Sequence, residues 1–380
     1  MSNDTTIIVY YGPLSWFEEE IGTEQSDSLL EIVYAREEER RQLRVVIPDQ
    51  PEAELNSWES DSPDRVVADS SDYASLNEHV ITNFAGLIHS IKPKHLFLHN
   101  PPVHVHIQLQ RHFPSMSVER YIYPAVTRET LIEFRDGFES HLIGQRAVKE
   151  TLLAALYPLT AQRRSQPVVL MFYGPSGVGK TETAQFINSL LGGTLLRKQF
   201  SMFHNDNFAS YLFGGNHSEP SFAHDLLDRE SGVILIDEFD KANSIFHSAF
   251  YQLFDGGVFE DKNYRVQLGP SLIICTSNYS SEGQIREALG DALYSRFDSL
   301  MGFQALSIDE TRQVIDRIFS RYVSELTVEE QGLLNIENLK TILHPLANDS
   351  TNVRRIGKLI KEVISLSLVR SILGNHPSER

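Results

Sequence analysis

The feature that most constrains the fold of this chain is a glycine-rich segment that directly follows an apolar run. The run, VVLMFY at residues 168–173, is typical of a central parallel strand that is buried on both faces. The next eight residues match the pattern G-x-x-x-x-G-K-[ST] in full: Gly174, Pro175, Ser176, Gly177, Val178, Gly179, Lys180 and Thr181. An apolar pattern with helical spacing follows over residues 181–191. The succession of strand, loop and helix predicts an α/β fold with a phosphate-binding loop.

The chemistry of this loop predicts ATP and Mg²⁺ as cofactors. Its glycines allow backbone N–H groups to converge on phosphate oxygens, and the following helix directs its positive end at the same anion. Lys180 is expected to neutralise phosphate charge and Thr181 to coordinate Mg²⁺. The alternative, a glycine-rich turn without nucleotide, does not account for the flanking strand and helix.

Two further apolar runs end in polar residues that suit the same chemistry. The run VILI at 233–236 leads into Asp237 and Glu238, and the run SLIICT at 271–276 leads into Ser277 and Asn278. Ligands of parallel sheets bind at the carboxyl ends of the strands. We therefore expect Asp237 to hold Mg²⁺, Glu238 to activate the attacking water, and Asn278 to position it. The alternative for the carboxylates is a helix cap or turn.

Composition sets limits on the partners. The 380 residues carry a formal charge of −17, and residues 1–130 hold 21 acidic against 10 basic side chains. This balance makes nucleic acid an improbable partner, because phosphate binding needs clustered Lys and Arg. No apolar run approaches the length of a membrane span, and the single cysteine, Cys275, fits a reducing compartment. A cytoplasmic protein is the expectation.

The first 125 residues are expected to form a separate α/β domain. Short apolar runs at 6–12, 43–47 and 94–98 predict strands, while 28–41, 76–91 and 103–113 predict helices. Residues 48–72, rich in Pro, Ser and Asp, predict a long exposed loop. Histidines gather in this part of the chain, at His95, His99, His104, His106 and His112. A metal site is possible in principle, but acidic partners at ligand spacing are missing, which favours a structural role.

The second half of the chain resembles the AAA+ superfamily, in its Clp-type and torsin-like branch. The resemblance rests on GPSGVGKTETAQ at 174–185, DEFDKA at 237–242, FDGG at 254–257, and TSN at 276–278. It covers about residues 140–375, and it implies an ATPase with a three-layer parallel-sheet domain over 126–304 and a helical lid over 305–380. Residues 1–125 carry no such resemblance.

The resemblance also implies roles for residues outside the three motifs. In HLIGQ at 141–145, Ile143 and Gly144 would pack on adenine. In LYSRFD at 293–298, Arg296 would be an arginine finger that reaches the γ-phosphate of a neighbouring subunit in a hexameric ring. In NVRRI at 352–356, Arg354 would be the second sensor, with Arg355 as a rival because the usual Gly and Pro are absent.

Two departures from the family pattern bear on function. The segment between Leu212 and Phe222 lacks the aromatic-glycine motif with which such rings grip polypeptide, although Phe222 could replace it. The tripeptide that docks a Clp-type peptidase is also missing. The sequence thus favours an ATP-driven ring that remodels a protein partner recruited by residues 1–125. A nucleotide-gated assembly or signalling module is the alternative, and a DNA-directed motor is the third.

Overall fold

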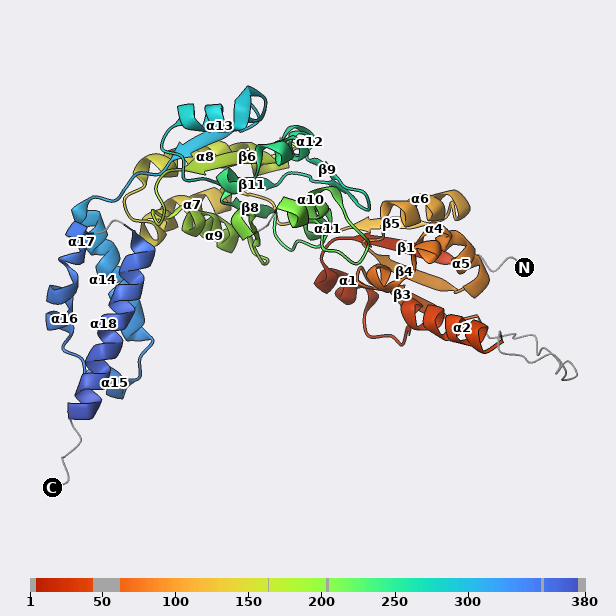
Figure 1. Cartoon of the computed structure of the whole chain (residues 1–380), viewed down its shortest axis with the longest axis horizontal. Coiled ribbons are helices and arrows are strands. Elements are labelled where there is room, and N and C mark those ends of the chain that lie inside the picture. Colours follow the sequence, from red (N-terminus) through yellow and green to blue (C-terminus); the bar gives the residue numbers. More distant parts are fainter. Residues whose placement is uncertain (1–4, 44–61, 163, 203–204, 350–351, 375–380) are drawn as a thin grey trace, which may run out of the picture.

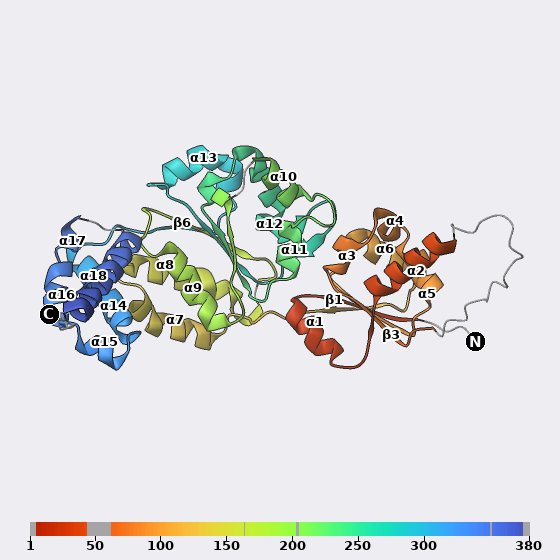
Figure 2. The same cartoon turned by 60° about the horizontal axis from the view of Figure 1, so that its bottom comes forward.

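The computed structural model describes residues 5–43, 62–162, 164–202, 205–349 and 352–374. The chain follows one direction through three packed units (Figure 1): an N-terminal α/β unit, a central α/β unit, and a helical bundle at the opposite end. A second view keeps the same succession, with the central unit between the other two (Figure 2). The expectation of two α/β parts and a C-terminal helical part is confirmed. Among the described residues, no helix is long and apolar enough to cross a bilayer.

The N-terminal unit is built on a parallel five-stranded sheet of order β2-β3-β4-β1-β5. Its strands are β1 (Thr6–Tyr11), β2 (Asp27–Ser28), β3 (Arg65–Ala68), β4 (His95–His99) and β5 (Ser117–Arg120). Its helices are α1 (Leu14–Ile21), α2 (Leu29–Leu43), α3 (Asp72–Ser75), α4 (Glu78–Thr82), α5 (Phe84–Ile91) and α6 (Val103–His112). One apolar core unites both sets of elements.

Several expectations for this unit need correction. The loop expected over 48–72 contains β3, whose inward side chains Val66 and Ala68 are fully buried. Two inward positions are too few to give a recognisable alternation. The helix expected over 76–91 is broken at Asn83, which adopts φ −123° and ψ 39° between α4 and α5. Of the strand expected over 43–47, Leu43 ends helix α2, and 44–47 lie outside the described residues.

The central unit is a three-layer structure around a second parallel sheet, of order β12-β6-β11-β8-β7. Its strands are β6 (Val168–Tyr173), β7 (Leu196–Gln199), β8 (Val233–Asp237), β11 (Leu272–Thr276) and β12 (Ser299–Gly302). Alternate side chains of β6, β8 and β11 enter opposite cores, as the period of a strand requires. Both faces are therefore covered, which explains why these strands are apolar throughout.

Helices from two stretches of the chain cover the two faces. One core contains side chains of α7 (Arg128–His141), α8 (Arg146–Leu156) and α9 (Lys180–Leu191). The other contains side chains of α10 (Asn205–Phe213), α11 (Phe222–Leu227), α12 (Tyr251–Gly256) and α13 (Glu282–Tyr294). The antiparallel pair β9 (Val258–Glu260) and β10 (Arg265–Gln267) forms a hairpin.

The helical unit packs α14 (Ile308–Ser324) against α18 (Val353–Gly374), around a core centred on Ile315, Phe319 and Ile360. Shorter helices complete it: α15 (Val328–Gly332), α16 (Ile336–Leu343) and α17 (Leu346–Asp349). Helix α14 begins with a capping box, in which Ser307 and Glu310 satisfy each other's backbone N–H groups. The start of α18 touches the central unit, since the backbone N–H of Val353 donates to the carbonyl of Gly177 at 3.3 Å.

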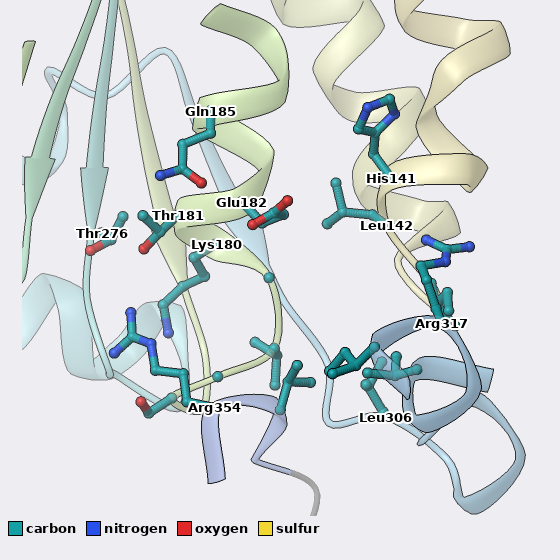
Figure 3. Close-up of a pocket in the computed structure, with 18 of the residues that line it drawn as sticks. His141, Leu142, Lys180, Thr181, Glu182, Gln185, Thr276, Leu306, Arg317 and Arg354 are labelled. Atoms are coloured by element: carbon teal, nitrogen blue, oxygen red, sulfur yellow. The ribbon is translucent and has the colours of Figure 1, made fainter. Parts of the chain in front are cut away.

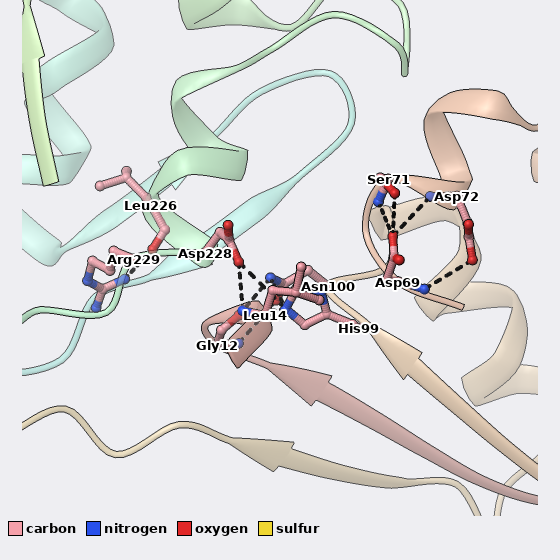
Figure 4. A network of polar contacts seen from close by, with 10 residues as sticks. All are labelled: Gly12, Leu14, Asp69, Ser71, Asp72, His99, Asn100, Leu226, Asp228 and Arg229. Carbon is pink, nitrogen blue, oxygen red and sulfur yellow. Dashed lines mark hydrogen bonds and ion pairs between the residues drawn. The ribbon is translucent and has the colours of Figure 1, made fainter. Parts of the chain in front are cut away.

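The N-terminal unit is joined to the central unit by contacts as well as by the chain (Figure 4). The carboxylate of Asp228, in the turn after α11, accepts a hydrogen bond from the backbone N–H of Leu14 at 2.9 Å. The guanidinium of the neighbouring Arg229 is buried, 3.8 Å above the ring of Tyr123. The turn of the β9–β10 hairpin adds a third contact, from the backbone N–H of Val103 to the carbonyl of Asn263 at 2.9 Å.

Candidate nucleotide-binding site

The topology of the central sheet brings the three sequence motifs together. Strands β6, β11 and β8 are adjacent and parallel, so their carboxyl ends lie at one edge of the sheet. The glycine-rich loop follows β6, Asn278 follows β11, and Asp237 and Glu238 close β8. Residues more than fifty positions apart therefore line one cavity, of about 550 Å³.

The glycine-rich loop needs glycine for its conformation and its close neighbours. Gly177 and Gly179 have φ of 80° and 106°, a region that other residues rarely adopt. A Cβ on Gly177 would lie 2.6 Å from Oδ1 of Asn352, the residue directly before helix α18 of the helical unit. The loop is thus shaped both by its own backbone and by the contact with the helical unit.

Hydrogen bonds hold the side chain of Lys180 over this loop. Its side chain is buried, and its Nζ donates to the carbonyls of Gly174 and Pro175 at 2.6 and 2.8 Å and to Oδ1 of Asn278 at 3.3 Å. Burial lowers the pKa of Lys180 to about 8, partly opposed by the carboxylates of Asp240 and Asp237. All three hydrogen-bond acceptors are neutral. An anionic phosphate oxygen would be a stronger partner for this cation.

Asp237 and Glu238 are fixed by polar side chains from neighbouring strands. Oδ1 of Asp237 accepts from the hydroxyl of Thr276 at 2.5 Å, and its Oδ2 accepts from Nε and Nη2 of Arg197 at 3.1 and 2.5 Å. Oε2 of Glu238 accepts from Nε2 of Gln199 at 3.0 Å. Sequence reasoning missed Arg197, Gln199 and Thr276. Arg197, Lys198 and Gln199 are consecutive polar residues of β7, so no local pattern distinguished the first and the third.

Glu238 also has an unusual backbone conformation. Its φ of 58° lies in the left-handed region, which costs about 1 kcal/mol or more in a residue other than glycine. The backbone N–H of Glu238 donates to Oγ1 of Thr276 at 3.0 Å, which helps to hold this conformation. The turn directs the chain away from the sheet directly after the two carboxylates.

Apolar side chains line the other end of the cavity, which suits the base of a nucleotide. Leu142, Ile143 and Leu306 line it together with Val314 and Ile318 of α14 (Figure 3). Gly144, with φ of 81°, lies against Leu306 and Glu310, where a Cβ would come within 3 Å of both. Gly144, Gly174 and Pro175 do not themselves line the cavity. The latter two act through their carbonyls on Lys180.

The helical unit contributes cations to this cavity. Arg354 lines it close to Lys180 (Figure 3), whereas Arg355 is not among the lining residues, and both arginines are exposed. Of the two rivals for the second sensor, Arg354 therefore has the better position. Arg317 and Arg321 of α14 also line the cavity, and sequence reasoning did not single them out.

Arg296 lies outside the cavity of its own chain. Its Nε contacts Oδ2 of Asp255 at 2.8 Å, its guanidinium lies 4.5 Å above the ring of Tyr251, and Nη1 donates to the carbonyl of Ala292. The side chain is one-quarter exposed. The prediction that it acts on another subunit is compatible with this position and stays a prediction.

The structure also shows the position of Phe222, the residue that could replace the aromatic-glycine motif. Phe222 is fully buried at the start of α11, where its ring lies edge-on to the ring of Phe259. Phe222 therefore packs this helix onto the core and cannot grip a polypeptide.

The histidines of the N-terminal unit make separate contacts, such as that of Nε2 of His99 with the carbonyl of Gly12 at 2.7 Å. In the part of the chain that the structure describes, no group of three or more His, Cys, Asp or Glu could hold a metal ion.

Comparison with known proteins agrees with this geometry. The family described as AAA domain (Cdc48 subfamily) matches residues 165–334. The chaperone protein ClpB of Chlamydia trachomatis serovar D is 25% identical over 283 residues, which cover 64% of this chain and 32% of that protein. The ClpA homolog protein of Fuscovulum blasticum is 26% identical over 283 residues, covering 64% and 35%. The chain thus spans about a third of the length of these relatives.

Solved structures share the fold. Closed-state Hsp104 with ATPyS and FITC casein gives a TM-score of 0.56 at 19% identity, covering 81% of this chain and 62% of that chain. The extended Hsp104:casein complex of S. cerevisiae gives 0.56 at 22% identity, covering 66% and 49%.

The parallel sheet, the glycine-rich loop and the carboxylates at the edge of the sheet define a P-loop nucleotide-binding protein. Within that class, the AAA domain match over residues 165–334 and the similarity to the ClpB and ClpA proteins support a Clp-type AAA+ ATPase. The resemblance inferred from the motifs is confirmed.

Proposed function

We propose that this chain binds Mg²⁺·ATP in the cavity and hydrolyses it, and that hydrolysis drives the remodelling of a protein partner. The observation that carries the first part is the convergence of Lys180, Asp237, Glu238 and Asn278 on one cavity with an apolar end. A base fits the apolar end, and the phosphates fit the glycine-rich loop.

The residues present fit a magnesium ion. The hydroxyl of Thr181 and the carboxylate of Asp237 both line the cavity, and oxygen donors of this kind suit Mg²⁺, which retains several water ligands. When bound, the ion would neutralise charge that develops on the phosphates. Glu238 would accept a proton from the attacking water, while Asn278 would orient that water and Lys180 would hold the phosphate.

We further propose a hexameric ring in which Arg296 completes the site of the adjacent subunit. Its position outside its own cavity supports this role, and an arginine finger contributes about 10³–10⁵ in rate in P-loop ATPases. The test mixes Arg296→Ala subunits with Lys180→Ala subunits. Shared sites should restore part of the activity, and defects confined to each mutant's own subunit would contradict the ring.

A protein is the proposed partner, recruited by residues 1–125. One relative is named chaperone protein ClpB, and the titles of the two Hsp104 structures include casein. The N-terminal unit has its own core and is fixed to the central unit, so a partner that it binds would be held beside the ATPase. Because Phe222 is buried, we expect a limited action on a dedicated partner rather than threading of any polypeptide through this residue.

The partner is tested with a Glu238→Gln trap, which should keep ATP and partner bound together. Lys180→Ala, which should not bind ATP, is the matched control. Recovery of the same proteins with both variants would contradict ATP-dependent trapping, and recovery with a chain that lacks residues 1–125 would contradict recruitment by the N-terminal unit.

A further inference from the structure

A salt bridge occupies the place where the magnesium ion is expected. The guanidinium of Arg197, on strand β7, contacts Oδ2 of Asp237 through both Nε and Nη2, at 3.1 and 2.5 Å. The hydroxyl of Thr276 donates to Oδ1, the other carboxylate oxygen of Asp237, at 2.5 Å. Both oxygens of Asp237 are therefore engaged by the chain itself, and Arg197 lines the same cavity as Lys180.

The surroundings of the two partners differ. The side chain of Asp237 is 7% exposed, and a buried carboxylate is costly without a counter-charge. The side chain of Arg197 is 37% exposed, and among the residues that the structure describes β7 is an edge strand of its sheet. The carboxylate is thus fixed, whereas the arginine has room to swing toward solvent.

We propose that Arg197 is a positioning residue that stands in for Mg²⁺ at Asp237 and is displaced when Mg²⁺·ATP enters. This rests on the proposed function. In the nucleotide-free protein, Arg197 compensates the buried charge and keeps the carboxylate directed at the cavity. A dication at the same carboxylate repels the guanidinium, because two positive centres would then lie within a few ångströms of one another. Arg197 therefore sets the Mg²⁺ concentration at which nucleotide binds.

Two variants of Arg197 separate the effect of its charge from the effect of its geometry. Arg197→Gln removes the cation and keeps a polar side chain, while Arg197→Lys keeps the charge without the planar fork. Lys198→Gln is the matched control, because it removes one charge from the next position of β7. The ammonium of Lys198 contacts Asp225 at 2.7 Å, and Lys198 does not line the cavity.

The experiment titrates Mg²⁺ into full-length protein with a fluorescent ATP analogue and records the midpoint for nucleotide binding. Arg197→Gln should lower the midpoint about tenfold relative to wild type, because the competing cation is gone. Arg197→Lys should shift it less, and Lys198→Gln should leave it unchanged.

Two results would overturn this proposal and leave the proposed function intact. An Arg197→Gln midpoint that equals the wild-type value, with or without weaker binding at every Mg²⁺ concentration, would show a merely structural residue. A raised midpoint would show that Arg197 assists the ion. Absence of nucleotide binding by the wild-type protein would instead overturn the proposed function and this inference with it.

Discussion

The chain contains two parallel five-stranded sheets, and the carboxyl edges of the two sheets face different surroundings. The edge of the central sheet opens on a cavity lined by Lys180, Asp237 and Glu238. The edge of the N-terminal sheet faces the central unit, whose Asp228 accepts from the backbone N–H of Leu14 (Figure 4). The same architecture therefore provides a ligand cavity in one unit and a docking face in the other, which shows that function resides in the site and not in the fold.

The polar groups at the two edges also differ in whether a ligand can displace their hydrogen-bond partners. In the central unit, Lys180 is held by neutral carbonyls that a phosphate can outcompete. In the N-terminal unit, His99 and Asn100 are fully buried, and both contact the carbonyl of Gly12, at 2.7 and 2.8 Å. One edge is ready for exchange with a ligand, and the other is closed by the chain's own hydrogen bonds.

The largest expected difference between the two edges is catalytic. Glu238→Gln should lower ATP turnover by about 10²–10⁴, because it removes the group that accepts the proton of the attacking water. Nucleotide affinity should remain, since Lys180 and the glycine-rich loop are intact. Phosphate release and nucleotide binding, measured on the same preparation, check this. Glu182→Gln, which alters another carboxylate of the cavity, is the control, and equal loss in both variants would refute the assignment.

Acid should affect the N-terminal edge through His99. Burial lowers the pKa of His99 to about 4, opposed by its hydrogen bond to the carbonyl of Gly12, whereas an unfolded histidine titrates near about 6.5. Between these values the unfolded state binds a proton that the folded state does not, so stability falls as pH falls through this window. The loss from pH 7.5 to pH 4 should be about 3 kcal/mol.

Denaturant unfolding followed by tryptophan fluorescence measures this loss, because both tryptophans of the chain lie in residues 1–125. His99→Gln should flatten the pH dependence, and the exposed His112→Gln should retain it. A His99→Gln protein that is as acid-sensitive as wild type would show that another group is responsible.

Docking of the two units should depend on Arg229. Arg229→Met removes a buried cation over the ring of Tyr123 and should weaken the contact by about 2 kcal/mol, the value of a desolvated cation–π pair. The rate of limited proteolysis in the connection at 121–127 should rise accordingly. Arg286→Met, at an exposed pair with Asp291, should leave the rate unchanged. Equal rates in all three proteins would show that Arg229 does not hold the units together.

The same two sheets show what the sequence can reveal. Strands β6, β8 and β11 were predictable because burial on both faces makes them continuously apolar, and polar residues at their ends identified the site. The four-residue strand β3 was mistaken for loop, and β5, with four exposed residues, gave no signal. Arg197 was missed because its role depends on the pairing of β7 with β8, a neighbour relation that no local pattern encodes.

The central claim is that the edge of the central sheet binds ATP through Lys180. Calorimetric titration of wild-type protein and Lys180→Ala with ATP in excess Mg²⁺ tests it most directly. We predict saturable binding of one ATP per wild-type chain. In Lys180→Ala we predict no measurable binding, because the cation that faces the phosphates is removed. Unchanged affinity in Lys180→Ala, in a protein that unfolds like wild type, would contradict the claim.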